Sequence, residues 1–201
     1  MRLGILGGTF DPIHLGHLLL AEQAREALDL DRVLLMPAAR PPHKPDAPIS
    51  DFADRLRMVA LAAEESDGLF ASDLERDAGV PSFTVATLRR LRAQEPEAEL
   101  WLILGGDSLR DLPTWREPEE IVRLARIAVY PRPGEDEASA NPPAQLLGAS
   151  ATHLPGPRVH LASTEIRARV AAGRSIRFLV PRAVERYIEE RGLYLPATEA
   201  R

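Results

Sequence analysis

The sequence contains no cysteine among its 201 residues. A disulfide framework and thiolate metal sites are thereby excluded, and the composition is compatible with a reducing cytoplasm. Long apolar runs are lacking as well. The first run, Leu3–Leu6, is much shorter than the apolar core of a signal peptide, and no segment approaches a membrane span. We therefore expect a cytoplasmic protein with no membrane partner.

Positive charge is also in short supply. The chain has 25 Lys and Arg against 30 Asp and Glu, a formal net charge of −5. Proteins that bind nucleic acid usually carry a basic surplus, so we expect no nucleic-acid partner, although the balance is compatible with a local basic pocket. With 45% hydrophobic residues the chain can bury a core of its own, and residues 1–201 are interpreted as one domain.

Short apolar runs alternate with helical patterns along the chain. The expected strands are Leu3–Leu6, Arg32–Met36, Leu69–Ser72, Glu99–Leu104, Arg126–Tyr130 and Val159–Leu161. The expected helices are Gly16–Leu28, Asp51–Glu65, Phe83–Gln94, Glu117–Leu124, Ser163–Ala172 and Pro181–Arg191. This order predicts an α/β protein with a doubly wound, open parallel sheet and helices on both faces. The C-terminal helical portion covers about residues 163–195.

Two stretches interrupt this pattern and are interpreted as loops. Residues 37–48 are rich in proline, and residues 134–157 are rich in Pro, Ala, Gly and Ser. Glycine pairs follow two of the expected strands, at Gly7-Gly8 and Gly105-Gly106, and we expect both at one crevice of the sheet. They match neither the phosphate-binding loop of kinases nor the dinucleotide motif of dehydrogenases.

The most informative segment is residues 7–17, where a glycine pair precedes two histidines at the start of a helix. Gly7 and Gly8 carry no Cβ and tolerate positive φ, so the backbone there can approach a bulky phosphate. His14 and His17 fall on one face of the first helical turn, where free N–H groups and the helix dipole favour anions. This pattern predicts a phosphate site with two imidazoles directed at one spot.

A second polar helix start lies at Ala162–Arg167. Hydroxyl groups at Ser163 and Thr164, with Arg167 one turn later, form a cradle suited to a polyphosphate. The same pattern is also compatible with an ordinary helix cap and surface charges.

The two segments together resemble a known superfamily. Residues 7–17 read Gly-Gly-Thr-Phe-Asp-Pro-Ile-His-Leu-Gly-His, which is similar to the signature of nucleotidylyltransferases with the His-x-Gly-His motif. Further segments along nearly the whole chain resemble bacterial nicotinate-nucleotide adenylyltransferases; they are Pro41–Lys44, Asp54–Met58, residues 75–88, Gly105–Trp115 and Leu179–Tyr194. The resemblance implies a Rossmann-like nucleotidylyltransferase fold. It also implies transfer of the adenylyl group of ATP to nicotinate mononucleotide, giving nicotinate adenine dinucleotide and pyrophosphate, a step of NAD biosynthesis.

The resemblance also implies roles for individual residues. His14, His17 and Arg167 are catalytic; Gly7, Gly8, Thr9, Phe10, Gly105, Asp107, Ser163 and Thr164 bind ATP; Lys44, Phe83, Thr84 and Trp115 bind nicotinate mononucleotide, with Arg132 as a further candidate. Two positions depart from the family pattern, since many relatives have Ser at Ala162 and often Tyr at Phe83.

These assignments make physical sense at several positions. The indole of Trp115 offers a face on which a pyridine ring can stack, or it simply packs against a neighbouring helix. Backbone amides near Phe83 and Thr84, at a helix start, can receive a carboxylate. Asp107 can accept hydrogen bonds from ribose hydroxyls or cap the following helix. The proline-stiffened loop limits the movement of Lys44, so its charge can meet a phosphate at low entropic cost.

The implied chemistry is a direct in-line displacement, in which positively charged groups stabilise the charge on phosphorus and on the leaving pyrophosphate. His14 and His17 are assigned to the α-phosphate, and Ser163, Thr164 and Arg167 to the leaving phosphates. Mg²⁺ is expected as a cofactor held mainly by ATP oxygens, with no dedicated protein metal site. ATP and nicotinate mononucleotide are the expected partners, and a homo-oligomer is left open.

Other interpretations stay open at this point. The acceptor could be nicotinamide mononucleotide or phosphopantetheine, or the chain could be a nucleotide sensor without activity. A tRNA ligase, suggested by a distantly similar histidine motif, fits poorly with the short, acidic chain. A metal site at the His pair has little support, because the chain offers few other histidines and no clustered carboxylates.

Overall fold

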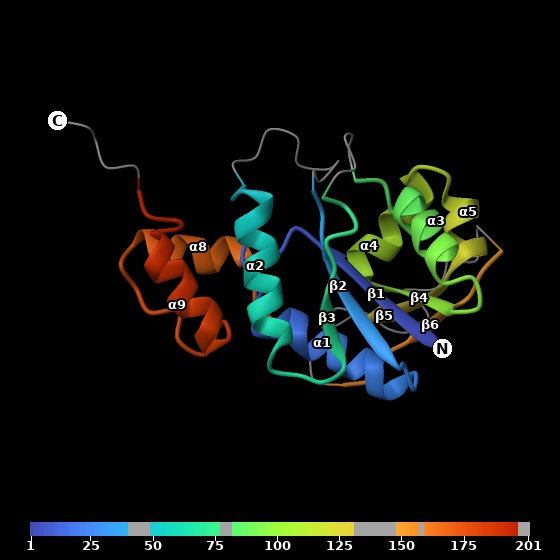
Figure 1. The fold of residues 1–201 in the computed structure, drawn as a ribbon, viewed down its shortest axis with the longest axis horizontal. Helices are drawn as coiled ribbons and strands as arrows, with labels where there is room; N and C mark the ends of the chain where they lie inside the picture. The colour runs from blue at the N-terminus through green and yellow to red at the C-terminus, as the bar shows by residue number, and fades with distance from the viewer. Residues whose placement is uncertain (40–48, 77–81, 131–147, 157–158, 197–201) are drawn as a thin grey trace.

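The computed structural model describes residues 1–39, 49–76, 82–130, 148–156 and 159–196 (Figure 1). Its strands are β1 (Arg2–Gly8), β2 (Arg32–Pro37), β3 (Leu69–Ala71), β4 (Glu99–Gly105), β5 (Arg126–Tyr130) and β6 (Ala151–His153). Its helices are α1 (Leu15–Ala27), α2 (Phe52–Ala63), α3 (Thr84–Gln94), α4 (Gly106–Asp111), α5 (Pro118–Leu124), α8 (Ser163–Ala171) and α9 (Arg182–Arg191), with a short 3-10 helix η1 (Leu112–Thr114). No helix within the described ranges has the length and apolar character to cross a membrane.

The strands form one parallel sheet in the order β3-β2-β1-β4-β5-β6. The order reverses direction between β1 and β4, which is the topological switch point of a doubly wound sheet. β1 pairs with β4 only from Arg2 to Ile5, although it pairs with β2 as far as Gly8. The carboxyl ends of β1 and β4 therefore separate and open a crevice between them. The predicted fold class is confirmed.

Helices cover both faces of the sheet, as Figure 1 shows: α1 and α2 lie on one side, with α8 and α9 beyond them, and α3, α4 and α5 lie on the other. The residues of β4 alternate between two buried clusters. Leu100, Leu102 and Leu104 pack on the side of α3 and α5, while Trp101 and Ile103 pack on the side of α1 and α2. This period of two is what a strand buried on both faces requires.

The last strand differs from the prediction. Val159–Leu161, expected as a strand, belongs to no strand of the structure, and the sixth strand is Ala151–His153, inside the stretch interpreted as a loop. β6 is a three-residue edge strand paired to β5, and only Ala151 is buried in it. Val159 is largely exposed, so the apolar character of its segment does not reflect burial in the sheet. Helix α8 consequently begins after an extended segment rather than after a strand.

A buried arginine joins the loops that leave β1 and β2. The side chain of Arg55, on α2, is only 1% exposed. Its guanidinium donates to the backbone carbonyls of Thr9 at 2.8 Å, Ala38 at 2.8 Å and Ser50 at 3.0 Å. Burying a charge is costly unless its donors are used, and here each of these bonds ties a loop to α2. Arg55 therefore fixes the backbone at the carboxyl end of the sheet.

We expect replacement of Arg55 by leucine to lower the free energy of unfolding by about 3 kcal/mol, because several buried carbonyls lose their donors. Urea denaturation at constant pH measures this change. The matched control is Arg57→Leu on the same helix, where an exposed arginine has one loose ion pair, at 3.6 Å to Glu64, and we expect a change within about 0.5 kcal/mol. Equal losses in both variants would contradict the role given to Arg55.

Candidate active site

The two histidines of the first motif lie together at the start of α1. His14 is the N-cap residue and His17 is in the first turn. Their rings are stacked, with centroids 3.6 Å apart and an interplanar angle of 17°. The backbone N–H of His14 donates to Nδ1 of His17 at 3.2 Å. This bond fixes the orientation of the His17 ring at a helix end that favours anions.

Burial favours the neutral form of both histidines. Burial lowers the pKa of His14 from 6.5 to about 4. Burial, and next the proximity of His14, lower the pKa of His17 well below its ordinary value. Burial therefore disfavours the charged form of both imidazoles. Neutral imidazoles remain able to donate and accept hydrogen bonds, and a bound polyphosphate would favour protonation.

The ring of Phe10 packs against the stacked histidine pair. Its side chain is 1% exposed, and its ring meets the ring of His17 edge to face, with centroids 4.9 Å apart. Phe10 has a positive φ, +49°, whereas Gly7 and Gly8 do not. A Cβ on Gly8 would lie 2.9 Å from the Phe10 ring, whereas a Cβ on Gly7 would meet no atom within 4 Å. Gly8 is thus required for packing, and Gly7 faces open space.

The second motif meets the first directly. Arg167, on α8, donates through Nη1 to the backbone carbonyl of Asp11 at 2.7 Å. Ser163, the first residue of α8, donates its hydroxyl hydrogen to the carbonyl of Pro12 at 2.9 Å. The two ends of the chain therefore converge, as the phosphate-site hypothesis requires. The hydroxyl proton of Ser163 is already in use, which leaves its backbone N–H and the exposed Thr164 to face a ligand.

The carboxylate of Asp11 holds this junction. It is 1% exposed and accepts from the hydroxyl of Tyr194 at 2.7 Å and from the backbone N–H of Ser50 at 3.3 Å. Arg167 lies 4.0 Å from the same carboxylate. Asp11 and Tyr194 each lie in a segment that resembles the family, but nothing in the sequence spacing indicates that they pair.

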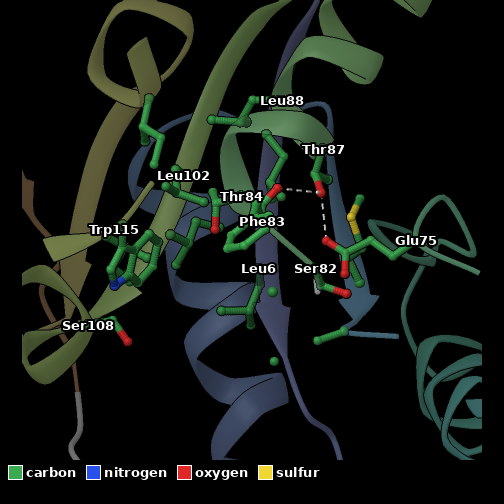
Figure 2. A pocket seen from close by; sticks show the side chains of 18 of the residues that line it. Leu6, Glu75, Ser82, Phe83, Thr84, Thr87, Leu88, Leu102, Ser108 and Trp115 are labelled. Carbon is green, nitrogen blue, oxygen red and sulfur yellow. Dashed lines mark hydrogen bonds between the residues drawn. The ribbon is translucent and has the colours of Figure 1, made fainter. Parts of the chain in front are cut away.

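A cavity of about 380 Å³ lies next to the motif loop, between the ends of β1 and β4 (Figure 2). Its lining includes Gly7, Gly8, Thr9, Phe83, Thr84, Gly105 and Trp115, all predicted as binding residues. His14, His17, Asp107, Ser163, Thr164 and Arg167 do not line it. The predicted site thus divides into an aromatic cavity and a polar junction of helix ends, which share the loop after β1. Lys44 and Arg132 lie outside the described residues.

The structure bears on two alternatives that the sequence left open. Trp115 directly follows η1, packs in part against the buried cluster beside α3 and α5, and also lines the cavity, so its packing against the protein is compatible with a place at the cavity. Asp107 does not cap a helix, because the N-cap of α4 is Gly105. Its carboxylate forms an ion pair with Arg110 in the same helix.

Sequence reasoning missed two charged residues of the cavity lining, Glu75 and Arg116. Glu75 is 8% exposed, and its Oε1 accepts from the hydroxyl of Thr87 at 2.7 Å, as Figure 2 shows. Arg116 places its guanidinium 4.8 Å from the centroid of the Phe83 ring. Glu75 begins one of the segments that resemble the family, and Arg116 directly follows another. Only the fold shows that both residues face one cavity.

A protein-held metal is not indicated by the residues that the structure describes. Within them, no group of three or more His, Asp or Glu side chains could hold an ion. The polar junction presents N–H and hydroxyl donors, which suit phosphate oxygens, and its Asp11 carboxylate is occupied by Tyr194 and Ser50.

Comparison with known proteins agrees with this geometry. The model of the cytidylyltransferase-like family matches residues 5–169. A probable nicotinate-nucleotide adenylyltransferase of Thermus thermophilus is 48% identical over 194 residues, covering 96% of this chain and 100% of the relative. Another, from Citrifermentans bemidjiense, is 44% identical over 215 residues, covering 98% and 100%. The structure of Plasmodium falciparum nicotinic acid mononucleotide adenylyltransferase complexed with NaAD has a TM-score of 0.79 at 19% identity, covering 96% and 97%.

The low pKa of His14 has two measurable consequences. NMR titration of the ligand-free protein should give this imidazole a midpoint near pH 4, because burial penalises its charged form. Between about pH 6.5 and 4 the unfolded chain binds the proton that the folded protein does not. The free energy of unfolding therefore keeps the full contribution of His14 above this range. It falls as the pH falls through the range, by about 3 kcal/mol at most.

The variant His14→Gln provides the control. It assigns the resonance by its disappearance, and its stability should depend less steeply on pH over the same range, since carboxylates contribute similarly to both proteins. A His14 midpoint near 6.5 would show that this ring is solvated and would refute its lowered pKa.

Proposed function

We infer that this chain, which belongs to the cytidylyltransferase-like family, is a nicotinate-nucleotide adenylyltransferase that converts ATP and nicotinate mononucleotide into nicotinate adenine dinucleotide and pyrophosphate. One observation carries the inference from the geometry. The helix start at Ser163–Arg167 is hydrogen-bonded to the loop that presents His14 and His17, directly beside an aromatic cavity. The site therefore has one region suited to a polyphosphate and, beside it, one suited to a flat ring. Relatives named as probable nicotinate-nucleotide adenylyltransferases are similar to this chain over nearly its whole length.

The reaction needs no protein nucleophile. An oxygen of the 5′-phosphate of nicotinate mononucleotide attacks the α-phosphorus of ATP, the new P–O bond forms, and the bond to the β-phosphate oxygen breaks to release pyrophosphate. The attacking oxygen is already deprotonated near neutral pH, so a general base contributes little. The rate depends on alignment and on stabilising charge at the phosphorus and the leaving group.

The helix-end junction is suited to that task. We assign the imidazoles of His14 and His17 to the α-phosphate, where neutral rings donate N–H bonds and gain proton affinity as negative charge arrives. The N-terminus of α8, with Ser163, Thr164 and Arg167, is assigned to the β- and γ-phosphates. Arg167 keeps N–H groups beyond the one that binds the Asp11 carbonyl, because a guanidinium has five donors.

The backbone near the glycines and the start of α4 is assigned to the rest of ATP. Gly7, Gly8 and Thr9 lie where β1 ends and line the cavity. Phe10 packs edge to face against the ring of His17 and so supports it. Gly105 and Asp107 lie at the end of β4, at the switch point where nucleotides bind in such sheets.

Mg²⁺ belongs to this proposal as an ion carried by ATP. It would neutralise charge on the phosphate oxygens and so ease departure of pyrophosphate. The N–H and hydroxyl donors at the junction suit phosphate oxygens rather than a cation, which supports coordination of the ion mainly by ATP oxygens.

The cavity is assigned to the pyridine nucleotide. The ring would stack on Trp115, and the backbone amides at the start of α3, near Phe83 and Thr84, would face its carboxylate. Lys44 is proposed to meet the 5′-phosphate, and Arg132 remains a further candidate.

Release of pyrophosphate tests the activity. We expect release from ATP with nicotinate mononucleotide, and little with phosphopantetheine, whose flexible chain offers no ring for Trp115. Nicotinamide mononucleotide is assayed in parallel. ATP binding by calorimetry without pyrophosphate release from either pyridine mononucleotide would identify a nucleotide sensor instead.

Replacement of His17 by alanine should lower kcat by about 10²- to 10⁴-fold, because an oriented donor at the α-phosphate is lost. Turnover is measured at saturating concentrations of both substrates, and circular dichroism verifies the fold. His160→Ala, which removes an exposed imidazole outside the junction, should keep full activity. Wild-type turnover by a folded His17→Ala protein would refute the assignment.

A further inference from the structure

The aromatic cavity has an uneven distribution of charge. Among its described lining residues, only Glu75 and Arg116 are charged. Figure 2 shows Glu75 beside Thr87 and Ser82, on the opposite side of Phe83 and Thr84 from Trp115. Arg116 follows Trp115 in the chain and extends over the Phe83 ring. A carboxylate is thus buried in one part of the cavity, and a guanidinium lies over the Phe83 ring, on the residue that follows Trp115.

Arg116 is weakly engaged by the protein itself. Its side chain is 61% exposed, and its ion pair with Glu117 is long, at 3.8 Å. The carboxylate of Glu117 is instead held by Arg89, through hydrogen bonds of 2.5 and 3.3 Å. Among the residues that the structure describes, none accepts a hydrogen bond from the Arg116 guanidinium, so its donors are available to a ligand. Its position over the Phe83 ring, 4.8 Å from the centroid, limits the directions that the guanidinium plane can adopt.

Glu75 makes its own part of the cavity unfavourable for the carboxylate of a substrate. One carboxylate oxygen accepts from Thr87, and the second is buried without a partner among the described residues. A substrate carboxylate placed near it would meet a like charge in a poorly solvated site. An acidic ring in this cavity is therefore directed away from Glu75 and toward the side of Trp115 and Arg116.

We propose that Arg116 binds the carboxylate of the pyridine ring and sets the preference of this site for nicotinate over nicotinamide mononucleotide, an inference that rests on the proposed function. The two substrates differ only in this group, which is a carboxylate in one and a neutral amide in the other. A guanidinium presents parallel N–H donors that match the two oxygens of a carboxylate, and an amide lacks both the second acceptor and the charge. Arg116 is thus a specificity-determining residue, separate from the groups at the phosphates.

The test compares Arg116→Gln, Arg116→Lys and wild type with each mononucleotide at saturating ATP. We expect Arg116→Gln to lower kcat/KM for nicotinate mononucleotide about tenfold or more, mainly through KM, with a change below about threefold for nicotinamide mononucleotide. For Arg116→Lys, kcat/KM for nicotinate mononucleotide should lie between the values of wild type and Arg116→Gln. Lysine keeps the positive charge but lacks the two parallel N–H donors of the guanidinium. The KM for ATP should stay unchanged in both variants.

Arg123→Gln is the matched control. This arginine is exposed on α5, binds Glu120 and does not line the cavity, so the same loss of charge there should leave both kcat/KM values unchanged. Thermal unfolding verifies that the variants are folded.

Two failures are distinguishable. If wild type turns over nicotinate mononucleotide but Arg116→Gln lowers both kcat/KM values equally, or neither, the role of Arg116 is overturned and the proposed function stands. If wild type releases pyrophosphate with neither mononucleotide, the proposed function fails, and the inference fails with it.

Discussion

The site depends on one constraint, the immobilisation of the loop between β1 and α1. Asp11 accepts hydrogen bonds at both carboxylate oxygens and at its backbone carbonyl, from Tyr194, Ser50 and Arg167. Ser163 holds the next residue, and Arg55 holds the carbonyl of Thr9 from beneath. Donors fixed in this way need no reorganisation when charge develops on a phosphate, which is the main source of electrostatic catalysis. The same bonds explain why α8 lies beside a motif more than 150 residues earlier in the chain.

The division of the site into two regions follows from the sheet. Where β1 and β4 separate, one side receives the apolar residues of the cavity and the other receives the ends of α1 and α8. The polar region is assembled in a form that carries little charge on its histidines, because burial lowers the pKa of both. The two imidazoles are already positioned and stacked before any anion is present, so under the proposed function the nucleotide would supply the charge. The cost of holding buried cations without a ligand is avoided.

Much of this arrangement was predictable from the sequence, because strong local patterns determine it. Five strands, most helices and the convergence of the two motifs follow from apolar periodicity, glycine pairs and helix starts. β6 was missed because three residues at a sheet edge leave almost no pattern, and Val159 was misleading because an apolar residue can stay exposed. The short helix α4 was missed for the same reason of length.

Other features depend on contacts between distant segments, which a single sequence does not reveal. The neutrality of His14, the positive φ of Phe10 and the position of Arg116 over Phe83 all arise from packing. Glu75 and Tyr194 carried family resemblance but no indication of their partners. The sequence thus indicated which residue types gather at the junction of helix ends, whereas their protonation and their supporting contacts required the fold.

The bond between Tyr194 and Asp11 joins positions 183 residues apart, and this span bears on how the protein is made. A ribosome synthesises the histidine loop long before the tyrosine that secures it. A nascent chain halted before position 194 has the histidine loop without this bond. The junction of helix ends is consequently completed only after Tyr194 has been synthesised and has packed against the much earlier Asp11.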